Sequence, residues 1–239
     1  MADEVFEIAG RFCGPPRSGN GGYVAGRIAR HISGSASIRL KAPPPLSTPL
    51  RIAVATQGVS LFADETLIAE GRSAPLELSP PKPPSFDFAR AASRSFLGFR
   101  SHPFPGCFVC GPARAEQDGL RIFPGTMDGG KTLAAPWIPD ATLVAEDGDV
   151  APEFVWAALD CTGGFAIFPA PAGSALVLGE LSAQVLSPLR AGERCVVLGW
   201  PLGDDGRRRF AGSALYGADQ RLIAFARAVW IQVPLSAWA

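Results

Sequence analysis

The sequence contains an internal repeat, and this repeat constrains the fold more than any other feature. The motif Leu-Ile-Ala-x-x-Arg occurs at residues 67–72 and again at residues 222–227. Upstream of each copy lies a segment typical of a strand, a proline-containing corner and a second strand, at residues 38–52 and 184–196. Self-similarity of this kind indicates that one structural unit is present twice.

A proline-rich stretch divides the chain between the two copies. Five prolines fall within ten residues, where neither a helix nor a central strand can continue: Pro75, Pro80, Pro81, Pro83 and Pro84. We therefore predict an N-terminal unit at residues 1–80, a linker at 81–105 and a C-terminal unit at 106–239.

Each unit has one helical segment, predicted at residues 21–32 and 152–167. The second begins with Pro152 and Glu153, which suit a helix start, and it is apolar on almost every face, so it should be buried. The first unit has its predicted elements in the same order as the second, but we expect it to lack one hairpin, between residues 54 and 67. Antiparallel strands are predicted in the second unit at residues 175–186, 194–201, 208–216 and 222–233.

Composition excludes several classes of protein. The chain has 22 Lys+Arg and 22 Asp+Glu, so no long-range field would attract nucleic acid. With 47% hydrophobic and 18% charged residues it is too apolar for a disordered chain.

No segment is long and apolar enough to cross a membrane, and the acidic N-terminus does not resemble a signal peptide. Five cysteines, an odd number, do not suggest a disulfide framework, so we expect a cytoplasmic protein without a membrane partner.

Two short motifs resemble the opening of single-hotdog acyl-CoA thioesterases. These are Cys-Phe-Val-Cys-Gly at residues 107–111 and Asp-Gly-Leu-Arg-Ile-Phe at residues 118–123. Proteins of that family continue with His-Gly-Gly and a helix whose carboxylate follows the His by nine residues. Together with the repeat, the resemblance implies an α+β double hotdog fold, in which each unit wraps an antiparallel sheet around a central apolar helix.

The family motif is divided between the two halves of this chain. Asp160 lies at the carboxylate position of the second half, but the three residues at the His-Gly-Gly position are 151–153, Ala-Pro-Glu. The first half has Asn20-Gly-Gly at that position and Ala29 in place of the carboxylate. The resemblance therefore implies one composite site, with Gly21 and Gly22 facing Asp160, and an inactive counterpart at the other position.

The expected chemistry is thioester hydrolysis. Asp160 would act as base or nucleophile, and the N–H groups of Gly21 and Gly22 at a helix start would stabilise the oxyanion. Asn20 and Thr162 are added as supporting residues, and the Thr162 hydroxyl is expected to hydrogen-bond either a water or the carboxylate. Each has a plainer interpretation: Asp160 as a polar residue near a helix end, Asn20 as an N-cap, the glycines as a tight turn, and Thr162 as a residue that is common after Asp.

The predicted substrate is an acyl-CoA thioester, bound without a cofactor. Trp156, on the buried helix, is a candidate for limiting the acyl tunnel. Arg207 and Arg208 could contact the phosphates of coenzyme A, or could simply be a solvated hairpin. The chain could also bind further copies of itself, forming a homo-oligomer of double-hotdog units.

Cys107-x-x-Cys110 with His102 also invites a zinc interpretation. Structural zinc usually takes four ligands from two paired motifs, and no second Cys-x-x-Cys is present. Cys161 and the two other cysteines stand alone in the sequence. We therefore expect no metal, and a tight turn at the Cys-x-x-Cys segment.

Two alternatives to a thioesterase remain open from the sequence. One is a hotdog enoyl-CoA hydratase or dehydratase, which would use an Asp/His pair that the sequence does not place together. The other is a non-catalytic acyl-CoA or lipid-binding protein, suggested by the missing histidine. Turnover of acyl-CoAs and hydration of an enoyl-CoA would separate the three.

Overall fold

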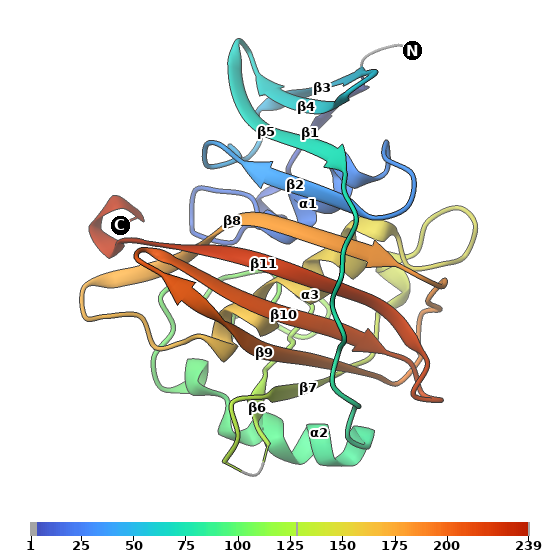
Figure 1. Ribbon diagram of the computed structural model, residues 1–239, viewed down its shortest axis with the longest axis vertical. Coiled ribbons are helices and arrows are strands. Elements are labelled where there is room, and N and C mark those ends of the chain that lie inside the picture. The colour runs from blue at the N-terminus through green and yellow to red at the C-terminus, as the bar shows by residue number, and fades with distance from the viewer. Residues whose placement is uncertain (1–3, 128, 239) are drawn as a thin grey trace.

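The computed structural model describes residues 4–127 and 129–238, and its strands form a single antiparallel sheet (Figure 1). The strand order is β1-β3-β4-β5-β2-β8-β11-β10-β9-β7-β6. The strands are β1 Glu4–Glu7, β2 Ala36–Leu40, β3 Pro49–Ala55, β4 Gly58–Ala63, β5 Thr66–Ser73, β6 Gly125–Thr126, β7 Leu133–Trp137, β8 Ser174–Val185, β9 Cys195–Asp205, β10 Arg208–Tyr216 and β11 Leu222–Pro234.

The strand order is arranged about the β2–β8 pair, where Ala36 lies opposite Ala183. On either side of this pair come β5 and β11, which carry the two copies of Leu-Ile-Ala-x-x-Arg, and then β4 and β10, β3 and β9, and β1 and β7. The repeated motif therefore occupies matching places in the sheet. The prediction that the first unit lacks a hairpin is wrong, because β4 pairs with both β3 and β5.

Two helices pack side by side against one face of the sheet (Figure 1). These are α1 Gly21–Ala29 and α3 Pro152–Ala166, within three residues of the predicted ends. Every residue of α3 from Glu153 to Phe165 is buried, as its uniformly apolar sequence requires. The remaining helices are α2 Phe86–Ala92 and the short 3-10 turns η1 Gly10–Phe12, η2 Ser93–Ser95, η3 Leu97–Phe99, η4 Ala141–Leu143 and η5 Leu235–Trp238.

Two glycines one turn apart allow α1 to approach α3 closely. A Cβ atom on Gly22 would lie 2.6 Å from the Cβ of Asp160, and one on Gly26 would lie 2.4 Å from the Cα of Glu153. Both distances are shorter than real side chains tolerate. The spacing of Gly22 and Gly26 thus brings the backbone of α1 against α3 and sets the position of the site described below.

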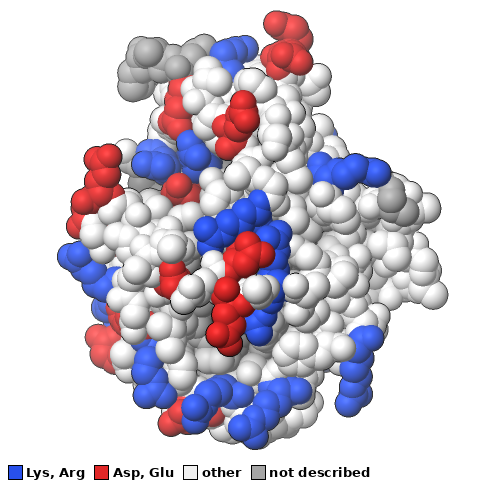
Figure 2. Space-filling view, turned by 180° about the vertical axis from the view of Figure 1, so that it is seen from behind, with Lys and Arg blue, Asp and Glu red and all other residues white. Residues whose placement is uncertain are grey.

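The face opposite to that of Figure 1 carries charges of both signs. Figure 2 shows Lys and Arg side chains interspersed with Asp and Glu, and its central cluster combines the two. Among the described residues, no helix has the length and apolar character needed to span a bilayer.

Candidate active site

Asp160 is the centre of a buried polar network between α1 and α3. Its Oδ2 accepts hydrogen bonds from the Asn20 side-chain amide and from the Gly22 backbone N–H, each at 2.9 Å. Asn20 in turn accepts the N–H of Tyr23 at 2.9 Å and is the N-cap of α1. The N-cap interpretation of Asn20 is therefore confirmed, and the same side chain also orients the carboxylate.

Burial raises the pKa of Asp160 to about 7, because its charged form is poorly solvated between the two helices. The hydrogen bonds from Gly22 and Asn20 oppose this increase, and the nearby Cys107 adds to it. The other carboxylate oxygen, Oδ1, is buried and has no hydrogen-bond partner among residues 4–127 and 129–238. A carboxylate that titrates near neutrality and keeps one oxygen unpaired is suited to accept a proton or attack a carbonyl carbon.

The two glycines at the start of α1 were expected to face Asp160 and to donate their N–H groups to an oxyanion. The expected position of Gly22 is confirmed, because its N–H donates to Asp160. Its expected role is wrong, because that N–H is already used by the carboxylate. Gly21 lines the adjacent cavity, and within the described part of the chain its N–H donates to no other group. The first N–H of a helix needs an external acceptor, so Gly21 remains the candidate donor to an oxyanion.

A cavity of about 260 Å³ adjoins this network and is lined mainly by apolar side chains. Asn20, Gly21 and Asp160 form part of its wall, and Lys41 supplies a cationic group. Its apolar wall includes Phe165, Phe168, Leu176, Leu178 and Trp230. The cavity therefore combines an apolar space with a polar end at the start of α1, a combination typical of small-molecule sites.

Two of the residues expected to support the site lie elsewhere on α3. The hydroxyl of Thr162 is fully buried and has no hydrogen-bond partner among the described residues, so the predicted contact with the carboxylate is wrong. Trp156 is also buried, and it packs against Gly22 and Gly26 of α1 instead of lining the cavity. Asp160 therefore faces both α1 and the cavity, whereas Trp156 fills the interface between the helices.

The arginines of the β9–β10 turn are also outside the cavity wall. Arg207 and Arg208 are exposed, and Arg208 forms an ion pair with Asp205. The neighbouring Arg209 points inward instead and donates to the carbonyl of Ile167 at 2.9 Å. Its guanidinium therefore binds a free carbonyl at the C-terminus of α3, where a positive charge is favourable. Contact of Arg207 or Arg208 with coenzyme A stays a prediction.

Three cysteines and a histidine also meet at this cavity. Cys107, Cys110 and Cys161 are buried, and all three line it together with His102. Cys161 is isolated in the sequence, but it is not isolated in the fold, because α3 brings its sulfur to 3.7 Å from that of Cys107. The sequence placed Cys161 directly after Asp160, which was the signal that both would reach the same end of the cavity.

The start of α3 differs from the start of α1. Glu153, in its first turn, is buried and forms an ion pair of 3.5 Å with Arg30 at the end of α1. Neither residue is part of the cavity wall. An acidic side chain occupies the position corresponding to Gly22, and it is neutralised by the opposite helix.

No protein-family model and no curated protein sequence matches this chain, but solved structures do. The tesB protein MAP1729c of Mycobacterium avium subspecies paratuberculosis aligns over 97% of this chain and 93% of its own, at 12% identity and a TM-score of 0.61. A proposed thioesterase II from Thermobifida fusca YX aligns over 98% and 93%, at 15% identity and a TM-score of 0.60.

A third similar structure carries the name of the fold. This protein of unknown function from Alicyclobacillus acidocaldarius, described as having a hotdog fold, aligns over 97% of this chain and 93% of its own. The identity is 10% and the TM-score is 0.57. At such low identities the similarity concerns the fold and leaves activity undecided. The chain thus has a hotdog fold, which it shares with solved structures of proteins named as thioesterases.

Proposed function

We propose that this chain is a thioesterase that hydrolyses acyl-CoA thioesters at a composite site between two hotdog units. The units would be residues 1–80 and 106–239, joined by the linker at 81–105. Two observations support this division. The strands are ordered in matching pairs about β2–β8, and each proposed unit contributes one of the two packed helices, α1 or α3. The observation that carries the function is the contact of Asp160 with Asn20 and Gly22, which joins the two units in one polar network.

The proposed reaction uses groups that are already in place. The thioester carbonyl would lie with its oxygen at the Gly21 N–H, where the start of α1 favours developing negative charge. Asp160 Oδ1 would either remove a proton from a water that attacks the carbonyl carbon, or attack that carbon itself. In the first route the C–S bond breaks, the proton taken up by Asp160 passes to the leaving sulfur, and the acid and the free thiol of coenzyme A leave. In the second route, C–S cleavage leaves an anhydride between Asp160 and the acyl group; a water then hydrolyses this anhydride, giving the acid and regenerating Asp160, and its proton goes to the thiolate.

The cavity supports an apolar acyl group as the part of the substrate that enters the protein. Aromatic and aliphatic side chains on α3, β8 and β11 form one part of its wall, and burial of an acyl chain against them would contribute binding energy in proportion to the apolar area covered. Lys41 is the cavity residue that could meet an anionic part of the substrate, since its side chain is about one third exposed, although its ammonium already pairs with Glu70 at 2.7 Å.

A hydratase would need a histidine that acts together with the carboxylate. His102 does line the same cavity as Asp160, which the sequence did not indicate. Its two ring nitrogens are engaged, however: Nδ1 accepts the N–H of Phe104 at 3.0 Å, and Nε2 lies 3.3 Å from the sulfur of Cys110. The geometry therefore favours hydrolysis over hydration.

A panel of acyl-CoAs of increasing chain length tests the proposal, with release of free thiol as the readout. We expect turnover of at least one ester well above its uncatalysed hydrolysis. Formation of a 3-hydroxyacyl-CoA from an enoyl-CoA, without thiol release, would establish the hydratase instead. Tight binding of acyl-CoA with no turnover of any ester would establish a binding protein and contradict the proposal.

A further inference from the structure

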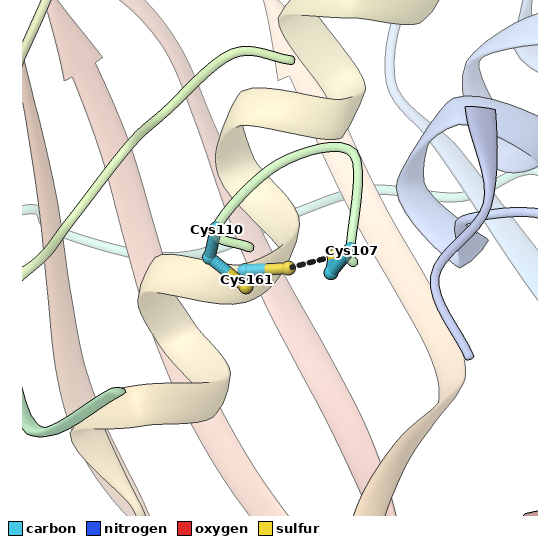
Figure 3. Close-up of side chains that lie close together, drawn as sticks. All are labelled: Cys107, Cys110 and Cys161. Atoms are coloured by element: carbon cyan, nitrogen blue, oxygen red, sulfur yellow. Dashed lines mark hydrogen bonds between the residues drawn. The ribbon is translucent and has the colours of Figure 1, made fainter. Parts of the chain in front are cut away.

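Three of the five cysteines converge at one point beside the cavity (Figure 3). Cys107 and Cys110 come from the loop that precedes Gly111, and Cys161 comes from α3. The three sulfur atoms lie within 4.8 Å of one another, and all three residues are buried. Convergence from two segments more than fifty residues apart requires the tertiary fold, and the motif Cys-x-x-Cys alone does not reveal it.

The arrangement of the sulfurs matches the donor set of a tetrahedral metal. Thiolate sulfurs about 2.3 Å from one tetrahedral zinc lie about 3.8 Å apart. Cys107 and Cys161 are 3.7 Å apart without any adjustment. Closing the remaining distances, all under 4.8 Å, requires only small side-chain movements. Soft thiolates in this geometry favour Zn²⁺ over Mg²⁺ or Ca²⁺, which prefer oxygen ligands.

The loop that carries the first two cysteines is a rigid turn. The Gly111 N–H donates to the carbonyl of Cys107 at 2.9 Å, and a Cβ on Gly111 would lie 2.4 Å from that oxygen. The turn therefore fixes the sulfurs of Cys107 and Cys110 relative to each other before any metal binds.

His102 acts on this cluster from its outer side. Its Nδ1 accepts a backbone N–H, so in the neutral ring the proton is on Nε2, which lies 3.3 Å from the Cys110 sulfur. His102 is thus placed to donate a hydrogen bond to a thiolate instead of binding the metal, a common role for groups outside the ligand shell. A fourth coordination position would face the cavity, because all three cysteines line it.

We propose that Cys107, Cys110 and Cys161 bind one zinc ion, with His102 as a hydrogen-bond donor to Cys110 and the fourth position open to the cavity. Binding displaces the thiol protons to solvent and leaves three Zn–S bonds. Three thiolates and Zn²⁺ carry a net charge of −1, which the His102 N–H and the backbone N–H groups of the turn partly offset. The proposal replaces the sequence-based expectation of a metal-free turn, and it stands whether or not the chain is a thioesterase.

The test measures metal content in the full chain, purified under reducing conditions without chelator. We expect about one zinc per chain by elemental analysis. Replacement by Co²⁺ should give the intense visible bands of tetrahedral cobalt and a near-ultraviolet thiolate-to-metal band. Cys161→Ser should weaken binding by about tenfold or more. The matched control is Cys195→Ser, since Cys195 is also buried but lies on β9 outside the cluster.

Two results would overturn the proposal. The first is a reduced wild-type chain that takes up no Zn²⁺ or Co²⁺ at equimolar metal, judged by competition with a chromogenic chelator and by absorbance. The second is undiminished affinity in folded Cys161→Ser. Because the wild-type measurements do not depend on any variant, the proposal can fail even if Cys161→Ser does not fold.

Discussion

The helix pair α1 and α3 has two ends that are alike in backbone and different in chemistry. Where α1 begins, Asn20 and Gly22 hold the carboxylate of Asp160, and a cavity lies alongside. Where α3 begins, a buried carboxylate, Glu153, occupies the helix start and pairs with Arg30. Among the described residues each carboxylate keeps one buried oxygen without a hydrogen-bond partner, but Asp160 lies beside the apolar cavity, whereas Glu153 lies outside it and pairs with a cation.

This difference shows how a repeated fold can concentrate chemistry at one place. A helix start can bind an oxyanion only if its N–H groups are not already bonded and no acidic side chain of the same turn opposes the negative charge. At the start of α1 the N–H of Gly21 is available, whereas at the start of α3 the carboxylate of Glu153 is present. In the proposed composite site the two units would contribute unequal parts: the first would supply the helix start, and the second the carboxylate.

Replacement of the carboxylate should have the largest effect. Asp160→Asn keeps size and one acceptor oxygen for Asn20 and Gly22, but removes the base or nucleophile. We expect turnover of the best acyl-CoA to fall by about 10²–10⁴-fold in steady-state kinetics. Thermal melts should show a folded protein. Wild-type turnover in this variant would mean that the reaction takes place elsewhere.

Removal of a single N–H should have the next largest effect. Gly21→Pro deletes the free N–H at the first position of α1, where proline suits the backbone. We expect a loss of about 10²–10³-fold in kcat, typical of one oxyanion donor. The matched control is Gly21→Ala, which places the same Cβ near Leu178 but keeps the N–H. Equal activity of the two variants would remove Gly21 from the mechanism.

The rate should also depend on pH in a defined direction. Because burial raises the pKa of Asp160 to about 7, kcat/KM should rise with pH, about tenfold per unit below pH 7, and level off above it. The assay uses protein treated with a chelator, so that a metal at Cys161 does not alter the titration. Asn20→Asp places a second carboxylate at the position of the Asn20 amide, 2.9 Å from Asp160. This like charge should raise the pKa of Asp160 and so move the rise of kcat/KM to higher pH. A flat profile from pH 5 to 9 would exclude this carboxyl as the base.

The smallest effect is expected at the other end of the helix pair. Glu153→Gln should leave turnover within a few-fold of wild type, because Glu153 lines no part of the cavity. Stability should change by less than about 1 kcal/mol, since Arg30 is nearly half exposed. Denaturant unfolding and the thioesterase assay check both. A loss as large as that of Asp160→Asn would make the two ends equivalent.

Most of the fold could be predicted because its signals are local. Periodicity, proline and glycine placed both helices and β8 to β11 of the second half, but not β6 and β7, and the repeated motif marked β5 and β11 as counterparts. β4 was missed although the buried Val59 and Leu61 alternate with Gly58 and Ser60, because this alternation covers only four residues before Phe62 and Ala63 interrupt it.

The site was only partly predictable because it depends on direction as well as proximity. The resemblance to the family motif predicted that Asn20 and Gly22 lie near Asp160. It did not predict that the carboxylate would accept the Gly22 N–H. In the same way, Thr162 and Trp156 share the helix of Asp160 yet point away from the cavity. Side-chain direction on a buried helix depends on its rotation against the partner helix, which is set by the Gly22 and Gly26 contacts.

The most direct test is a crystal structure with an acyl-CoA analogue in which a methylene group replaces the thioester sulfur, so that the carbonyl remains and hydrolysis cannot occur. The account predicts the carbonyl oxygen about 2.7–3.1 Å from the Gly21 nitrogen, with the carbonyl carbon facing Asp160. The acyl chain should lie against Phe165 and Trp230. A carbonyl bound at the start of α3, beside Glu153, would contradict the composite site.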